Sequence, residues 1–135
     1  MRFREGDLIE DVNGIIFDVK GLVHPLSKVV AFPRFVPDFE GERERGNTRY
    51  RKVYALSARY ELLEKRFPHY LVQDEVFGER LCEVSVSDVR RHYLPNKRLR
   101  ELRHSKQLNL LEQAALDFIS LLKKSASVTW NAFGV

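Results

Sequence analysis

The sequence predicts an α+β fold in which a small, curved antiparallel sheet, barrel-like in its curvature, packs against a helix and is followed by a C-terminal helical segment. Up to about residue 56, strand-like apolar runs alternate with turn residues. From residue 57 onward, most of the apolar residues recur with the helical period. The length of 135 residues suffices for one core. We therefore expect one compact unit with a mainly β part at residues 1–84, whose helix covers about 57–67, and a helical part at 85–135.

The composition is that of a folded, mildly basic protein. Hydrophobic residues make up 44% of the chain and aromatic residues 11%, which excludes general disorder. Lysine and arginine number 23 against 19 acidic residues, a formal charge of +4 that favours polyanionic partners. The single cysteine, Cys82, can form no internal disulfide, which is typical of a reducing compartment. No apolar run approaches the roughly 18 residues of a membrane span, so we expect a cytoplasmic protein.

The first predicted hairpin joins residues 7–11 to residues 14–19 through Asn13-Gly14. Asn-Gly supplies the positive φ angles of a type I′ turn. Four carboxylates in this hairpin raise the question of a metal site: Asp7, Glu10, Asp11 and Asp18. Because acidic residues are mostly exposed, we interpret them as a solvated sheet edge.

A second hairpin, residues 29–37 and 50–54, organises the β part. Pro33 predicts an edge position for its first strand, and the mixed charges of residues 38–49 predict a solvated, mobile loop. Its strands carry basic residues between aromatic ones, a pattern that can hold phosphate and stack on bases. These cations are Arg34, Arg49, Arg51 and Lys52. Strand alternation, with aromatic residues in the core and charges in water, explains the same pattern and stays open.

Ser57 is the predicted N-cap of the helix at 57–67, which Pro68 ends. Short strands are expected at 69–72 and 80–84. We interpret Cys82 as an inert buried thiol. For His24, which precedes Pro25, a structural turn outweighs a catalytic role, and His24 stays a weak candidate for such a role.

The strongest charge bias lies between Arg90 and Lys106, where seven lysines and arginines face one acid, Glu101. We expect a short helix from residue 85 and another over 95–104, with Leu99 and Leu102 toward the core. The cations of this region could contact a phosphate backbone together; the wet face of an arginine-rich, thermophile-like protein is the alternative. With those of the hairpin, the nucleic-acid-binding candidates are Arg34, Arg49, Arg51, Lys52, Arg90, Arg91, Lys97, Arg98, Arg100 and Arg103.

The last predicted helix, residues 110–124, begins at a reciprocal cap between Asn109 and Glu112. Leu111, Phe118 and Leu122 repeat at helical spacing, so we expect this helix to be buried along most of its length. The chain then ends on an apolar segment, residues 128–135. Natural termini are usually polar, so we expect the polypeptide to continue.

Short motifs along the chain carry a family resemblance. They are Gly14-Ile15-Ile16-Phe17-Asp18-Val19, His24-Pro25, Val36-Pro37-Asp38, Tyr50-Arg51-Lys52-Val53, Phe67-Pro68-His69-Tyr70, Tyr93-Leu94-Pro95 and Phe133-Gly134-Val135. In this order they resemble the amino-terminal region of an archaeal family of predicted nucleotidyltransferases of the DNA polymerase beta superfamily.

In that family, the segment like Phe133-Gly134-Val135 leads into a Gly-Ser loop and paired aspartates that hold nucleotide and metal. Neither element occurs in these 135 residues, so no catalytic residue and no metal ligand can be assigned. The resemblance implies that a divalent ion such as Mg²⁺ serves only the absent catalytic domain, which would follow Val135.

Two hypotheses of function follow. In the first, the chain is a non-catalytic N-terminal domain that recognises a nucleic-acid or nucleotide substrate, RNA or DNA, for a nucleotidyltransferase. In the second, it is a protein–protein interaction or dimerisation scaffold without nucleic-acid affinity. A free-standing enzyme is disfavoured, because no nucleophile, base or metal group can be named.

Overall fold

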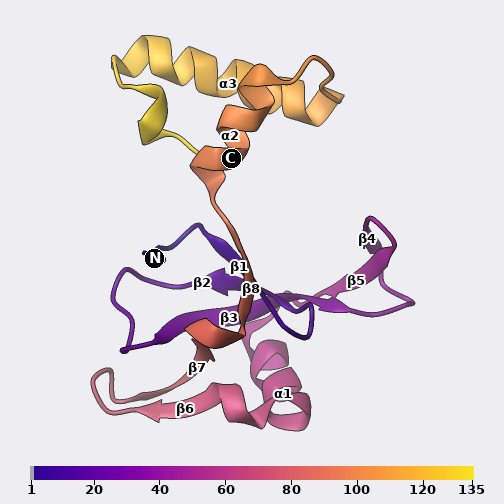
Figure 1. Ribbon diagram of the computed structural model, residues 1–135, viewed down its shortest axis with the longest axis vertical. Helices are drawn as coiled ribbons and strands as arrows, with labels where there is room; N and C mark the ends of the chain where they lie inside the picture. The colour runs from indigo at the N-terminus through magenta and orange to yellow at the C-terminus, as the bar shows by residue number, and fades with distance from the viewer. Residues whose placement is uncertain (1) are drawn as a thin grey trace. The chain divides into compact units, whose positions relative to one another are not determined.

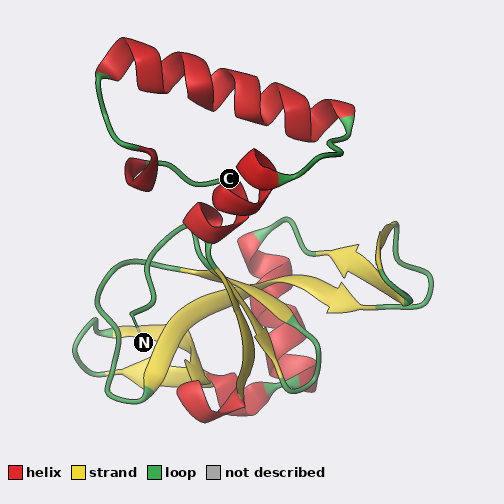
Figure 2. Ribbon diagram, turned by 45° about the horizontal axis from the view of Figure 1, so that its top comes forward, coloured by secondary structure: helices red, strands yellow, loops and turns green. Residues whose placement is uncertain are grey.

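The computed structural model describes residues 2–135 (Figure 1). Its contacts divide the chain into two units, the first ending at His92 and the second being Tyr93–Val135. The first unit contains the sheet and one α-helix, and the second contains two α-helices (Figure 2). The predicted α+β class is confirmed. The division into a β part and a helical part at residue 84 stays a prediction about folding domains.

The strands are β1 Leu8–Asp11, β2 Ile16–Val19, β3 Lys28–Pro37, β4 Arg43–Arg45, β5 Thr48–Lys52, β6 Leu71–Asp74, β7 Glu79–Ser85 and β8 Val89–Tyr93. The α-helices are α1 Leu56–Arg66, α2 Pro95–His104 and α3 Leu110–Ala126, and short 3₁₀ helices cover Pro68–Tyr70, Val86–Asp88 and Trp130–Ala132. The sheet order is β4-β5-β3-β2-β1-β8, and β7 joins β3 to β6. Figure 2 shows the sheet curling over α1, as the predicted curvature requires.

The long strand β3 is shared by three neighbours. Its first residues pair with β7, its last three pair with β5, and β2 lies along its other edge. The predicted edge position of β3 is therefore wrong. Pro33 lies opposite Phe17 of β2, and on the other edge of β3 it falls between the β7 and β5 pairings. Proline is tolerated where the edge of a strand has no partner.

The core of the first unit lies between the curled sheet and α1. Leu62 and Leu63 of α1 are buried against Phe17 of β2, Val29 of β3 and Val84 of β7. The predicted Ser57 cap is wrong, because α1 begins at Leu56 after Ala55, with no side-chain cap. Ser57 thus lies inside the first helical turn.

Three more local expectations are corrected. The first hairpin exists, but only Gly14 has a positive φ (+79°), and the turn closes by an Asp11–Gly14 hydrogen bond instead of a type I′ pair. The loop at 38–49 contains β4, paired with β5. Residues 89–93, expected as helix, form β8 beside β1, because pairing to the sheet overrides a weak local helix signal.

The second unit has a small core of Leu99 and Leu102 from α2 and Ile119 from α3. The helix predicted at 95–104 and the capping box of Asn109 and Glu112 are confirmed. The expected burial of α3 along most of its length is wrong, since Ile119 is its one buried residue. The single 10-residue helix α2 is too short to cover the 17-residue helix α3.

Candidate nucleic-acid interface

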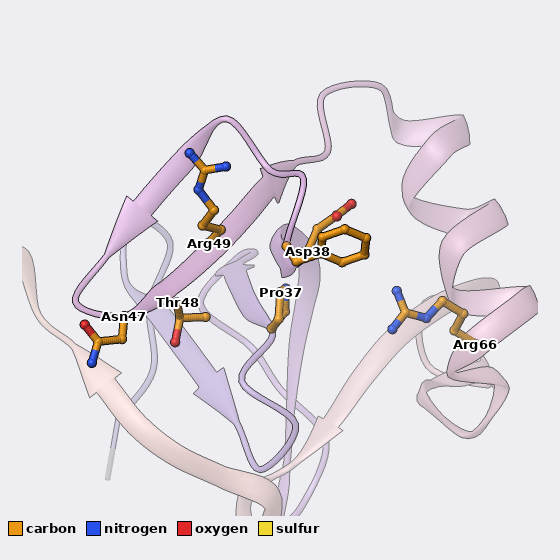
Figure 3. A pocket seen from close by; sticks show the side chains of 7 residues that line it. Pro37, Asp38, Asn47, Thr48, Arg49 and Arg66 are labelled. Atoms are coloured by element: carbon orange, nitrogen blue, oxygen red, sulfur yellow. The ribbon is translucent and has the colours of Figure 1, made fainter.

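The first unit carries a groove of about 660 Å³ beside the β4–β5 hairpin (Figure 3). It is lined by Pro37, Asp38, Phe39, Asn47, Thr48, Arg49 and Arg66. These residues come from three places: the end of β3 and the turn that follows it, the hairpin tip and first residues of β5, and the last turn of α1. Figure 3 shows Arg66 extending from α1 toward the side of the groove that carries Pro37.

The turn after β3 holds this side of the groove in place. The backbone N–H of Asp38 donates to the carbonyl of Arg49 at 3.0 Å, and the N–H of Gly41 donates to the carbonyl of Asp38 at 2.9 Å. A Cβ at Gly41 would overlap the carbonyl group of Tyr50, so the backbones approach too closely for any side chain. Glycine at this position lets the turn lie flat on β5.

The groove combines two guanidinium groups with an exposed aromatic ring. Arg49 and Arg66 are exposed, and the ring of Phe39 is 84% exposed. Arg66 lies over the ring of Phe67, 5.2 Å from its centroid, a contact that occupies the face of the guanidinium and leaves its N–H groups to bind an anion. Guanidinium groups bind phosphate with two parallel hydrogen bonds, and an exposed ring offers a stacking surface for a base. The carboxylate of Asp38 would oppose an anion, but it accepts a hydrogen bond from Arg51 Nε at 3.2 Å, which offsets its charge.

A second cavity of about 360 Å³ lies in the same unit. It is lined by Ile16, Phe35, Arg43, Glu44, Arg45, Tyr50 and Lys52. Arg45 donates to the buried carboxylate of Glu10 at 2.8 Å and lies over the ring of Tyr50. Lys52 lies 4.5 Å from the ring centroid of Tyr54. Much of the basic charge here thus already has partners, so this cavity is the weaker candidate.

The predicted hairpin cations have different roles in the structure. Arg34 donates to Asp18 at 2.8 Å and is partly buried, which makes it a structural ion pair. Arg51 is paired with Asp38, whereas Arg49 lines the larger groove. Arg90 and Arg91 are exposed on β8. Among the hairpin candidates, Arg49 is therefore the best placed to bind a phosphate.

The other predicted cations belong to the second unit. Lys97 and Arg100 are exposed on α2, as expected. Arg98 forms an ion pair with Glu101 within α2 and a second one with Glu112, which ties α2 to α3. The guanidinium of Arg103 lies 4.0 Å from the ring centroid of Trp130. Arg98 and Arg103 thus stabilise the second unit, which leaves Lys97 and Arg100 as its candidates.

Sequence reasoning missed Arg66 and Phe39. Arg66 ends a helix whose charged residues all look alike in the sequence, and Phe39 lies in a segment read as a mobile loop. Neither residue is distinguished until the strand end, the hairpin and the helix end come together. An aromatic residue inside a highly charged loop was the one available signal.

The carboxylates expected on a solvated edge are buried instead, with exposed fractions of 0 to 8% for Asp7, Glu10, Asp11 and Asp18. Each accepts hydrogen bonds from protein donors. Asp11 accepts from Asn13, from the backbone N–H of Ile15 and from Tyr70. Within residues 2–135, no group of three or more histidine, cysteine or acidic side chains could hold a metal ion. The carboxylates act as acceptors inside the fold.

Cys82 and His24 have the structural roles expected of them. Burial raises the pKa of the Cys82 thiol well above its usual range, and nearby Glu83 and Asp11 raise it further. Nδ1 of His24 accepts from the backbone N–H of Val30 at 3.1 Å, and Nε2 lies 3.2 Å from the carbonyl of Phe3. The second distance fits donation by Nε2–H, which is the neutral tautomer.

Comparison with known proteins identifies an archaeal relative. Over 99 residues, the chain is 34% identical to a protein of Methanocaldococcus jannaschii described as uncharacterized protein MJ1086. The aligned part covers 67% of this chain and 29% of the relative. No family model matches the chain, and no solved structure does. The 34% identity supports the expected archaeal relationship.

No helix in the described part of the chain has the length and apolar character to cross a membrane.

Proposed function

We propose that this chain binds nucleic acid without catalysing a reaction, as the substrate-recognition domain of a nucleotidyltransferase. The observation that carries the proposal is the groove that Arg49 and Arg66 line together with Phe39, whose ring is exposed. Two phosphate-binding groups and one stacking surface are the elements by which proteins hold single strands. The link to nucleotidyl transfer rests on the motif resemblance, and a Mg²⁺-dependent catalytic domain following Val135 is part of the same proposal.

The size of the archaeal relative is compatible with a domain of this kind. The aligned region accounts for 29% of its length, so most of that protein lies outside the part resembling this chain. In our proposal, such additional polypeptide makes the new bond, and the present chain positions the strand.

The test is the binding of fluorescent single-stranded RNA and DNA, measured by anisotropy at several salt concentrations. Because bound cations displace condensed counterions, log affinity should fall linearly with log salt. Replacing Arg49 and Arg66 by alanine should reduce the slope by about 1.4, or about 0.7 for each lost phosphate contact. Phe39→Ala should weaken binding roughly 5- to 100-fold and leave the slope unchanged, since stacking releases no counterions.

The matched control replaces Lys65 and Arg80 by alanine. Both are exposed cations of the same unit, paired with Glu61 and Glu64, and neither lines the groove. This variant loses the same charge, so an equal effect on binding would mean that net charge, not the groove, holds the strand. Absence of binding to either polymer at low salt would refute the proposed function.

A further inference from the structure

An uncovered apolar stripe runs along α3. Its large residues are Leu110, Leu111, Phe118, Leu121 and Leu122, which are 93, 79, 60, 60 and 38% exposed. Monomeric proteins rarely expose contiguous apolar patches of this kind. The opposite side of α3 packs in the second unit through Ile119 and the Arg98–Glu112 ion pair. The stripe is therefore not needed for the unit's own core.

The spacing of the stripe is that of a helix-pairing seam. Leu111, Ala114, Phe118, Leu121 and Ser125 follow one another at intervals of three, four, three and four residues. This alternation keeps side chains on one line along a helix and lets them interlock with a neighbouring helix. The large side chains of Phe118 and Leu121 form the middle of the seam, and the small side chains of Ala114 and Ser125 lie on either side of them. From Leu111 to Ser125 the seam is about 21 Å long.

The charges beside the stripe favour an antiparallel neighbour with the same sequence. Asp117 lies next to the seam toward the helix start, and Lys124 lies next to it toward the helix end. In an antiparallel pair of α3 helices, layers of Phe118 with the partner's Leu121 place Asp117 opposite the partner's Lys124, twice by symmetry. A parallel pair would instead bring equal charges and equal helix ends together.

We propose that this protein forms a homodimer through antiparallel packing of α3 against α3 of a second copy. The occupant of the stripe is thus another copy of the chain. The inference stands on the seam of α3, and it is independent of the groove proposed to bind nucleic acid.

The first test is sedimentation velocity of the full chain from about 1 µM to about 1 mM. This range of concentrations covers the dissociation constants expected for a dimer with a small interface. We expect a concentration-dependent monomer–dimer equilibrium. Phe118→Asp and Leu121→Asp should each weaken dimerisation at least about 100-fold, because they place a charge in an apolar seam. Leu26→Asp is the matched control, since Leu26 is 95% exposed in the first unit, and it should leave the equilibrium unchanged.

The second test is charge reversal. Asp117→Lys should weaken the dimer about tenfold, because two attractive contacts become repulsive. Adding Lys124→Asp to this variant should restore wild-type affinity. Asp117 also accepts from Gln113 Nε2 at 2.8 Å within the helix, so circular dichroism must show unchanged helix content in both variants. A double reversal no better than the single change would overturn the antiparallel register.

The third test is cross-linking between Ala114→Cys and Ser125→Cys proteins. The antiparallel register places these positions in one layer, so the mixture should form a disulfide-linked dimer while each variant alone should not. Native Cys82 is fully buried and does not compete. Self-cross-linking of the single variants would indicate a parallel pair. A protein that stays monomeric throughout, or a dimer that survives Phe118→Asp, Leu121→Asp and Leu111→Asp, would refute the proposal, because the stripe would then have another occupant or none.

Discussion

Asp11 connects the first hairpin to the 3₁₀ helix at Pro68–Tyr70 within the first unit. Its buried carboxylate accepts from the backbone N–H groups of Asn13 and Ile15 and from the hydroxyl of Tyr70 at 2.8 Å; the bonds to Ile15 and Tyr70 are buried. Burial raises the pKa of Tyr70, and the hydrogen bond to Asp11 raises it further, so the phenol remains a donor. A chain separation of 59 residues is thus bridged by one hydrogen bond.

We predict that Asp11→Ala lowers the free energy of unfolding by about 3 kcal/mol, because it leaves the buried N–H of Ile15 and the hydroxyl of Tyr70 without an acceptor. Tyr70→Phe keeps the ring packed against Phe17 and should cost about 1–2 kcal/mol. Urea denaturation followed by circular dichroism measures both. Equal costs for the two variants would show that Asp11 contributes only its bond to Tyr70.

Asp74, at the start of the β6–β7 turn, makes a contribution to stability that depends on pH. The backbone N–H of Phe77 lowers the pKa of this carboxyl group, and that of Val76 contributes in the same direction. A lowered folded-state pKa means that the stabilisation is present above the usual value of about 3.9 and is lost as pH falls through the folded pKa.

We therefore predict that the stability advantage of the wild type over Asp74→Asn shrinks as pH falls from about 6 to about 2. Both side chains are neutral at the lower pH, and asparagine can still accept from the same two N–H groups. Urea titrations of the two proteins at each pH give the difference, which removes the contribution of the other carboxylates. A difference independent of pH would contradict the assigned cause.

At the scale of elements, β5 joins the β4–β5 hairpin to β3 by strand pairing, and the turn after β3 lies close to β5 where Gly41 meets Tyr50. We predict that Gly41→Ala forces the turn away from β5 and destabilises the protein by about 1–3 kcal/mol. Amide hydrogen exchange should quicken in β4 and β5 first. Oligonucleotide affinity should fall as well, because the same turn carries Asp38 and Phe39 of the groove.

Gly78→Ala is the control for this prediction. Gly78 has a left-handed backbone conformation, with φ of +68°, whereas Gly41 is required by a close approach of two backbones. A Cβ at Gly78 would meet open space. It lies in the β6–β7 turn, away from the groove, so it should cost about 1 kcal/mol and leave binding unchanged. If both variants lost the same oligonucleotide affinity, the loss would result from lower stability of the whole unit and not from a change in the groove.

For the whole molecule, the two units differ in the size of their cores. The first unit buries a cluster drawn from its strands and α1, whereas the second depends on Leu99, Leu102 and Ile119. We predict that Ile119→Ala removes hydrogen-exchange protection from α2 and α3 while the amides of β2 and β3 keep theirs. Val84→Ala, at a fully buried site of the first unit, should remove protection from the amides of β2 and β3 while those of α2 and α3 keep theirs. Uniform loss of protection in either variant would mean that both units unfold together.

Helix ends and strand runs were predictable where local chemistry is sufficient. The capping box at Asn109 and the helix started by Pro95 depend on residues within one turn of each other. Residues 89–93 form a strand instead of the expected helix because Val89 and Tyr93, which share a helix face with Val86, also share one face of a strand that pairs with β1. The groove was half predicted: Arg49 was named, whereas Arg66 comes from a helix distant in sequence.

Periodicity and composition predict the α+β class, the hairpins, the two C-terminal helices and the abundance of cations. Which charged side chains are bonded within the fold and which face solvent depends on tertiary contacts. Asp11 and Arg34 look like surface residues in the sequence, yet both are bound within the first unit. The exposed stripe of α3 looks like a core face in the sequence. The physical reason is that burial depends on what packs against a residue, and that neighbour is set by contacts between distant segments.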